Sequence, residues 1–179
     1  MKIHMTQFPA VSETVYQWID TMQSSFVTVL IFLLFLFNFT TSIVPSESMN
    51  PTLTPREFLL GLKGNDFTYD DIVVFYPHEG DDETYVKRVV GVGGDVIAVT
   101  DGHLIRNGQV IDADYTAEEL IDYNMVPVTV PEESYFMMGD NRNNSMDSHF
   151  VGTIPKKQCK SKVIFHMNLW DQWEKIKSL

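Results

Sequence analysis

Two serines stand one residue apart in residues 45–53 (PSESMNPTL), between Pro45 and Pro51. A serine hydroxyl becomes an effective nucleophile when a neighbouring base accepts its proton. The two prolines restrict the backbone on either side, so the hydroxyls of Ser46 and Ser48 could be held around one carbonyl group. The pattern raises the hypothesis of serine-based acyl transfer, which requires a base elsewhere in the chain.

Two kinds of side chain could supply that base. Histidine is the usual partner of a serine nucleophile, and the chain has five: His4, His78, His103, His149 and His166. Only His149 follows a segment dense in polar residues. A lysine can serve instead if burial in apolar surroundings lowers its pKa by several units. Lys87, in residues 85–90 (YVKRVV), is the best placed lysine, although strand alternation alone does not say whether Lys87 or Arg88 faces inward.

Residues 139–148 (GDNRNNSMDS) form the densest cluster of Asp, Asn and Ser in the chain. A calcium loop starting at Asp140 would need an acid or amide at its third position, glycine at its sixth and glutamate at its twelfth. The chain has Arg142, Ser145 and Val151 there, which excludes that motif. Such side chains also bond to nearby backbone groups, and the segment is predicted to be a loop that orients a base.

A single apolar run must position the serines. Residues 25–44 carry no charge and are mostly Phe, Leu, Ile and Val. As a helix they would extend about 30 Å, enough to cross a bilayer core. A cleaved secretory signal is disfavoured because more than twenty mostly polar residues precede the run and no small-x-small cleavage site precedes Pro45. We therefore predict a membrane anchor at 25–44 after a short tail at 1–24. Flanking charge does not decide its orientation.

The remaining residues, 45–179, predict a mainly β domain. Apolar and β-branched runs alternate with turn signals, as is typical of antiparallel strands. The dipeptides Asp101-Gly102 and Asn107-Gly108 are strong hairpin signals. We expect an antiparallel sandwich or barrel-like domain, a short helix near 117–121, and an acidic candidate insertion at about 112–130. The expected strands lie near 57–61, 71–76, 84–90, 95–100, 103–106, 126–130, 134–138 and 162–167.

Charge and cysteine content exclude several function classes. The formal net charge is −11, and residues 45–155 carry twenty acidic against six basic side chains, which argues against nucleic acid as the main partner. A lone cysteine, Cys159, excludes an internal disulfide and multi-cysteine zinc sites. We expect no metal and no other cofactor. The basic end contains Trp170 and Trp173, a composition that suits either an anionic membrane surface or a solvated tail.

Four segments, in this order behind one anchor, resemble the bacterial type I signal peptidases, the membrane-bound leader peptidases with a serine–lysine dyad. Residues 45–53 look like that family's nucleophile box, 71–75 (DIVVF) like the next, 85–95 (YVKRVVGVGGD) like its lysine box and 139–148 like the last. The resemblance covers most of residues 25–155. This chain departs from the pattern at Asp70, at Gly93 where proline is frequent, at Asn143 where an acid is common, and at His149 where a base is common.

The resemblance implies roles for named residues. Ser48 would be the nucleophile and Lys87 the general base, with the Ser46 hydroxyl and the Ser48 backbone N–H forming an oxyanion hole. Ser145 would bond to the Lys87 amine. Asp147 and Arg142 would pair and, with Asp140, support the loop. The shallow substrate pockets would be lined by Val44, Met49, Tyr85 and Val86.

The resemblance also implies a function. The protein would be a serine endopeptidase of the plasma membrane with one membrane span and an extracytoplasmic catalytic domain, expected to be a monomer. Its partners would be the lipid bilayer and preproteins, whose signal peptides it would remove after small residues at Ala-x-Ala sites. An apolar rim at Phe58, Leu59 and Leu60 is expected to reach into lipid.

Other readings predict different features. A self-cleaving repressor-type protease would carry DNA-binding helices in place of an anchor. A histidine-based signal peptidase of the endoplasmic-reticulum type would have histidine at position 87. A catalytically silent, membrane-tethered binding domain of the same fold is the main alternative function, and a β-rich adhesin would need neither Ser48 nor Lys87.

Overall fold

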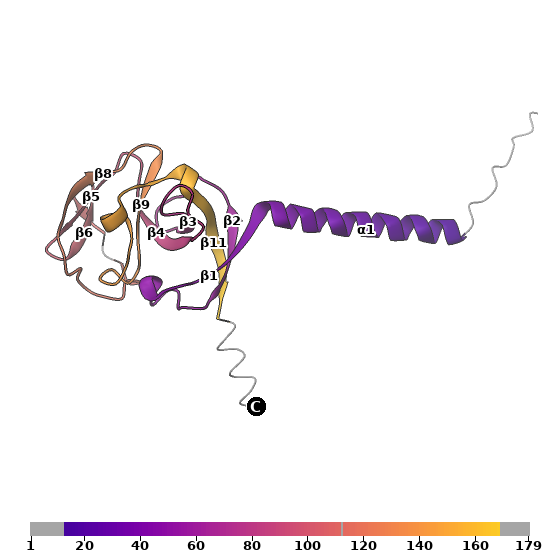
Figure 1. Cartoon of the computed structure of the whole chain (residues 1–179), viewed down its shortest axis with the longest axis horizontal. Coiled ribbons are helices and arrows are strands. Elements are labelled where there is room, and N and C mark those ends of the chain that lie inside the picture. Colours follow the sequence, from indigo (N-terminus) through magenta and orange to yellow (C-terminus); the bar gives the residue numbers. More distant parts are fainter. Residues whose placement is uncertain (1–12, 112, 169–179) are drawn as a thin grey trace, which may run out of the picture. The chain divides into compact units, whose positions relative to one another are not determined.

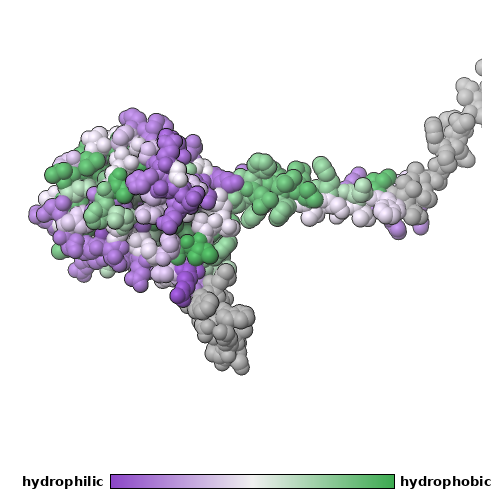
Figure 2. All heavy atoms as spheres, viewed as in Figure 1, coloured by the Kyte–Doolittle hydropathy of each residue, from purple (hydrophilic) through white to green (hydrophobic). Residues whose placement is uncertain are grey.

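A computed structural model describes residues 13–111 and 113–168 and divides the chain after Asn38 into two units (Figure 1). The first unit contains α1 (Glu13–Asn38). Within it, Tyr16–Asn38 contains an 18-residue window with a mean hydropathy of 1.8, and by length and composition this stretch could cross a membrane. The apolar residues gather in the C-terminal half of α1 (Figure 2). A helix cannot bury its own apolar side chains, so the apolar part of α1 requires apolar surroundings. This fits the predicted anchor.

The bounds of α1 differ from those predicted for the anchor. The helix already includes residues 13–24, which were assigned to the tail, and it ends at Asn38 instead of residue 44. Residues 39–43 form strand β1 (Phe39–Ile43), paired antiparallel with β2 (Phe58–Lys63). A polar contact accounts for this strand. Thr40 Oγ1 donates to Ser161 Oγ at 2.7 Å across the sheet, a bond that Thr40 could not make if the helix continued through a membrane. That α1 spans a membrane stays a prediction.

The second unit consists of two antiparallel sheets, which confirms the mainly β fold (Figure 1). The larger sheet has the order β1-β2-β11-β3-β4-β9-β10 and the smaller has the order β7-β6-β5-β8. The remaining elements are η1 (Glu47–Met49), β3 (Ile72–Phe75), β4 (Tyr85–Val92), β5 (Val96–Thr100), β6 (His103–Arg106), β7 (Gln109–Val110), β8 (Met125–Thr129), β9 (Ser134–Met138), α2 (Ser148–Val151), β10 (Ile154–Pro155), η2 (Lys156–Gln158) and β11 (Cys159–Met167).

The two hairpin predictions are confirmed. Asp101 and Gly102 have φ of 52° and 80°, and they join β5 to β6; Asn107 and Gly108 have φ of 55° and 79°, and they join β6 to β7. Paired positive φ values give the turn whose twist matches two antiparallel strands. These short hairpins let β5 and β6 present Ile97, Val99 and Leu104 to a core shared with Phe136 and Met138 of β9. This core holds the two sheets together.

Three other expectations have different outcomes. Residues 117–121 form no helix and lie in an irregular stretch whose backbone bonds go to other segments. Leu59 is 1% exposed in the core and cannot reach lipid, so the predicted rim of Phe58, Leu59 and Leu60 is wrong at its centre. Trp170 and Trp173 lie outside the described residues.

Candidate active site

Two buried apolar side chains hold the segment that carries Ser48 in place. Met49 is 1% exposed and Leu53 is 0% exposed, and both pack with Val44, Leu59 and Val74. Backbone bonds from Asn50 N to Glu47 O (3.0 Å) and from Leu53 N to Met49 O (2.9 Å) close the turn. The turn fixes Ser48, which is itself buried, on the cleft side of this cluster.

Lys87 lies on the central strand β4 and points at Ser48. Lys87 is 3% exposed. Its Nζ donates to Ser48 Oγ at 2.6 Å and to the Val86 carbonyl at 3.1 Å. Lys87 and Arg88 are both buried, and the contact with Ser48 Oγ shows that Lys87 is the one that faces the serine. Burial lowers the pKa of Lys87 to about 8, while the negative charges of Asp147 and Asp140 oppose this lowering. About one molecule in ten would then carry an uncharged amine at pH 7.

Ser46 lies within reach of the same atoms. Its hydroxyl donates to Ser48 Oγ at 3.2 Å, from an extended backbone at φ −143° and ψ 173°. A hydroxyl beside the nucleophile can turn toward an oxygen that develops negative charge, as an oxyanion hole requires. The predicted grouping of Ser46, Ser48 and Lys87 therefore exists in the structure.

Ser145 lines the same cleft, although the expected hydrogen bond to Lys87 is absent. Among the described residues, Ser145 Oγ is buried and has no hydrogen-bond partner. Its position is set by Gly139: a Cβ at residue 139 would overlap with Ser145 Oγ and with the Ser48 carbonyl oxygen. Any side chain at 139 would separate the loop from the nucleophile. A buried hydroxyl without a partner is costly, so Ser145 is available for a bond within the cleft.

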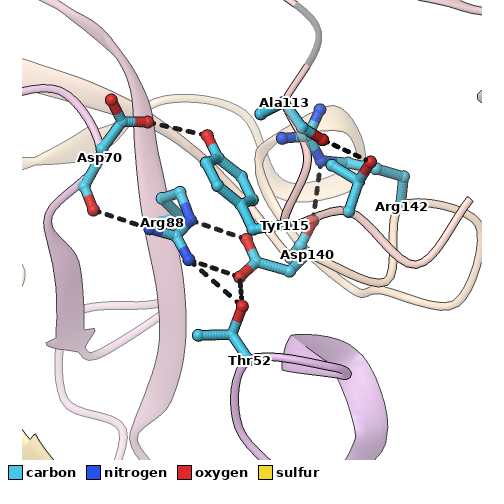
Figure 3. Close-up of polar contacts among 9 residues, drawn as sticks. Thr52, Asp70, Arg88, Ala113, Tyr115, Asp140 and Arg142 are labelled. Atoms are coloured by element: carbon cyan, nitrogen blue, oxygen red, sulfur yellow. Dashed lines mark hydrogen bonds and ion pairs between the residues drawn. The ribbon is translucent and has the colours of Figure 1, made fainter. Parts of the chain in front are cut away.

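The carboxylates of the 139–149 loop have different partners from those expected. In the described residues Arg142 and Asp147 form no ion pair, so that prediction is wrong. Asp140 instead accepts from Arg88 Nε (2.8 Å) and Nη2 (2.6 Å) and from Thr52 Oγ1 (2.5 Å), as Figure 3 shows. Arg88 points the opposite way from Lys87 along β4, and its planar fork matches a carboxylate. The pair joins β4 to the 139–149 loop at the residue that follows Lys87.

Asp147 is used inside the loop, which is why no ion pair with Arg142 forms. It accepts from Gly139 N at 2.9 Å, and as the N-cap of α2 it accepts from His149 N at 3.2 Å. His149 Nδ1 lies 2.7 Å from Asp147 Oδ1. Arg142 Nε donates to the Gly139 carbonyl at 3.0 Å. Both side chains bond to the backbone of the loop; that they support it for catalysis stays a prediction.

A cleft of about 890 Å³ joins these groups. It includes all four residues predicted to line the substrate pockets, namely Val44, Met49, Tyr85 and Val86, together with Ser46, Ser48, Lys87 and Ser145. Sequence reasoning missed Tyr123 and Phe150, which also line it. Tyr123 stacks on His149 with ring centroids 4.4 Å apart, and Phe150 packs against the same ring at 3.8 Å. No local pattern marks either residue, because their approach depends on how distant loops pack.

Two departures from the family pattern have a local physical account. Asp70 has φ of 67°, a left-handed conformation in which a non-glycine residue is uncommon. Its side chain is used there, accepting from Tyr115 OH at 2.7 Å. At Gly93 a Cβ would overlap with the backbone of Glu132, so a proline could not be accommodated beside the segment that precedes β9.

The sequence of the chain is similar to those of known proteins. Residues 16–170 match the family model described as "Signal peptidase, peptidase S26". Signal peptidase I of Leptolyngbya laminosa is 37% identical over 132 residues, which cover 68% of this chain and 64% of that protein. Signal peptidase I S of Bacillus subtilis is 38% identical over 148 residues, covering 73% and 78%.

Coverage of the relatives is incomplete. The chain spans 56% of a probable signal peptidase I-2 of Synechocystis, at 36% identity over 124 residues that cover 64% of this chain. A solved signal peptidase I from Enterococcus faecalis has 25% identity and a TM-score of 0.47, covering 54% of this chain and 96% of that one.

Proposed function

Because the chain belongs to the signal peptidase family, peptidase family S26, we propose that it is a membrane-bound serine endopeptidase that removes signal peptides from secreted preproteins. The single observation that supports this most strongly is the buried contact of 2.6 Å between Lys87 Nζ and Ser48 Oγ. Burial makes the amine of Lys87 a usable base near neutral pH. The substrate would be cut after a small residue at an Ala-x-Ala site.

The chemistry follows from the positions of these atoms. Uncharged Lys87 accepts the Ser48 hydroxyl proton as Oγ bonds to the scissile carbonyl carbon. The Ser46 hydroxyl and the Ser48 N–H donate to the resulting oxyanion. When the tetrahedral intermediate collapses, the ammonium of Lys87 gives its proton to the departing amine nitrogen, and an ester to Ser48 remains. Water attacks this ester, Lys87 takes the water proton and returns it to Ser48 Oγ, and the signal peptide leaves with a free carboxylate.

The remaining loop residues would support this dyad. The Ser145 hydroxyl, buried and without a partner among the described residues, is suited to bond to the Lys87 amine and orient it once substrate closes the cleft. Asp140, Arg142 and Asp147 would keep the loop in place. The apolar side chains of Val44, Met49, Tyr85 and Val86 would form shallow pockets, which accept alanine and exclude larger groups.

The anchor gives this activity a location. The family is membrane-associated, and α1 has the length and composition of a membrane span. We infer a single-pass plasma-membrane protein with the catalytic unit on the extracytoplasmic side, where cleavage sites of signal peptides emerge. Ser48 follows the last residue of α1 by ten residues in the sequence, which supports a nucleophile near the membrane surface. External protease added to spheroplasts should digest the catalytic unit; full protection would contradict this orientation.

Cleavage of a model preprotein tests the activity. The detergent-solubilised enzyme should cut after the second alanine of an Ala-x-Ala site, and Ser48→Ala and Lys87→Ala should be folded but inactive. A Lys157→Ala control removes an exposed lysine and should keep full activity. If wild type binds the preprotein but never cleaves it, the silent binding domain is the better description. If Lys87→Ala still cuts, another base such as His149 operates.

A further inference from the structure

Residues 113–124, here called the strap, connect β7 to β8 without forming a helix or strand. The strap docks on the 139–149 loop through hydrogen bonds to the backbone of that loop. Ala117 N donates to the Asp140 carbonyl at 2.9 Å, and Arg142 N donates to Glu118 Oε2 at 3.0 Å. Ile121 is 8% exposed in the core, and its N–H donates to the Gly102 carbonyl at 2.8 Å. An irregular segment bonded at this many points is a built part of the domain.

Two of the positions where the chain departs from the family pattern are contacts of the strap. Asn143 bonds to it in both directions: Oδ1 accepts from Asp122 N at 2.9 Å, and Nδ2 donates to the Leu120 carbonyl at 3.2 Å. An acidic side chain at 143 could accept from Asp122 N but could not donate to Leu120. His149 stacks on Tyr123, which is also part of the strap. The departures at Asn143 and His149 thus have a common explanation in strap docking.

The third such position, Asp70, meets the other end of the strap. Tyr115 OH donates to Asp70 Oδ1 at 2.7 Å, and its ring lies 3.8 Å from the Arg88 guanidinium carbon (Figure 3). The ring therefore covers the Arg88–Asp140 pair on one side. Arg88 also donates from Nη1 to the Asp70 carbonyl at 3.0 Å. Arg88 directly follows Lys87 on β4, so Tyr115 contacts the residue next to Lys87 in the sequence.

We propose that the strap is a positioning element of the active site, in which Tyr115 shields the Arg88–Asp140 pair and the remaining contacts hold the 139–149 loop against Ser48 and Lys87. The inference rests on the proposed function for its kinetic consequences. Tyr115 touches no reacting atom, so it is a positioning residue and its effect must pass through Arg88 and Asp140.

The groups around Lys87 determine how a change at Tyr115 would alter the pKa of its amine. Asp140 and Asp147 on the loop favour the charged form of Lys87. Arg88 on β4 pairs with Asp140, and His149 on α2 lies against Asp147. The Tyr85 ring lies 5.5 Å from Nζ, and β3 contributes the apolar Val73 and Val74. Tyr123 and Asp122 of the strap line the cleft with Lys87, as does Glu83, whereas Tyr115 contacts Arg88 and Glu118 accepts from Arg142 N.

Removing the Tyr115 ring lets water reach the Arg88–Asp140 pair. Asp140 is then less completely neutralised by Arg88, and the desolvation of the neighbouring amine decreases; both changes favour the charged form of Lys87. The entering water also screens Asp140, and we expect the first two effects to outweigh this screening, so that the pKa of Lys87 rises. A rise of about half a pH unit would leave about threefold less uncharged amine at pH 7.

The experiment compares Tyr115→Ala, Tyr115→Phe and the control Glu119→Gln, which alters an exposed strap residue. Preprotein cleavage is measured from pH 6 to 10, and the Lys87 side chain is titrated by NMR with ¹³C-labelled lysine, its signal assigned by loss in Lys87→Ala. For Tyr115→Ala we expect kcat to fall at least about threefold at pH 7 with KM within about twofold, and the acid limb and the NMR midpoint to shift upward together. Tyr115→Phe keeps the ring and should titrate like wild type.

The outcomes separate the two proposals. An unchanged Lys87 midpoint in folded Tyr115→Ala overturns the strap proposal, whatever the protein cleaves. If wild type cleaves no preprotein, the proposed function fails, while the NMR titration still decides the role of Tyr115. Should Tyr115→Ala fail to fold, Tyr115→Asn, whose short polar side chain does not cover the guanidinium, should show the same upward shift; a wild-type midpoint there also overturns the proposal.

Discussion

The burial of Lys87 should reduce the stability of the folded protein at neutral pH. The pKa of Lys87 falls from its ordinary value of 10.5 to about 8, mainly because burial disfavours its charged form. At about 1.4 kcal/mol per pH unit, this corresponds to about 3 kcal/mol. Below pH 8 the side chain is protonated in both folded and unfolded states, so the cost is present in full. Between pH 8 and 10.5 the unfolded state binds more protons, so stability rises with pH.

Substituting Lys87 by Met removes this cost while keeping a side chain of similar length. The variant loses the bonds from Nζ to Ser48 Oγ and to the Val86 carbonyl, each worth about 1 kcal/mol net. At pH 7 Lys87→Met should therefore be inactive and about 1 kcal/mol more stable than wild type. By pH 10 the free energy of unfolding of wild type should have gained about 2–3 kcal/mol on that of the variant, which reverses their order.

Urea unfolding of the detergent-solubilised full chain, followed by near-ultraviolet circular dichroism at pH 7, 8, 9 and 10, measures this difference. Other titrating groups are common to both proteins and cancel. Lys157→Met is the matched control, since the Lys157 side chain is 64% exposed beside Glu79, and it should show no pH-dependent difference from wild type. A constant difference between wild type and Lys87→Met across this range would refute the argument that burial lowers the pKa of Lys87.

Three further predictions concern the same site. The kcat/KM for preprotein cleavage should fall about tenfold per pH unit below an acid-limb midpoint near pH 8, because only uncharged Lys87 can act; a midpoint near about 6.5 would indicate a histidine base instead. Gly139→Ala should lower the thermal midpoint and abolish cleavage, since its Cβ would overlap with Ser145 and the Ser48 carbonyl; wild-type turnover would contradict that packing. Arg88→Ala leaves Asp140, 0% exposed, without its charged partner and should cost about 3–5 kcal/mol in urea unfolding, whereas a loss below about 1 kcal/mol would show that water replaces the guanidinium.

Local signals in the sequence predicted the parts of the fold that depend on local conformation. The Asp101-Gly102 and Asn107-Gly108 hairpins follow from conformations that these dipeptides readily adopt. Strand β1 was missed because the Thr40–Ser42 stretch directly continues an apolar run, and only pairing with β2 and Ser161 distinguishes a strand from the end of a helix.

The candidate site was predicted as a set of residues more completely than as a set of contacts. The alternation of β4 predicted that Lys87 and Arg88 lie on opposite faces, but only the tertiary contacts show that Lys87 meets Ser48 and that Arg88 meets Asp140. The carboxylate that pairs with an arginine is Asp140 and not Asp147. Its partner Arg88 lies 52 residues away along the chain, so no local spacing in the sequence indicates this pair. Tyr123 entered the cleft through the docking of the strap, a tertiary contact that no local pattern encodes.

The sheet order has a kinetic consequence for a newly made chain. In the hydrogen-bonded order of the larger sheet, β11 lies between β2 and β3. The half that carries the nucleophile segment, β1 and β2, is thus joined to the half that carries the base, β3 and β4, by the last strand of the described chain. Synthesis proceeds from the N-terminus, and long-range strand pairing is slow to form. A growing chain therefore cannot complete this sheet until β11 has been made, and until then the strands beside the Ser48 segment and the strands beside Lys87 are not joined through the sheet.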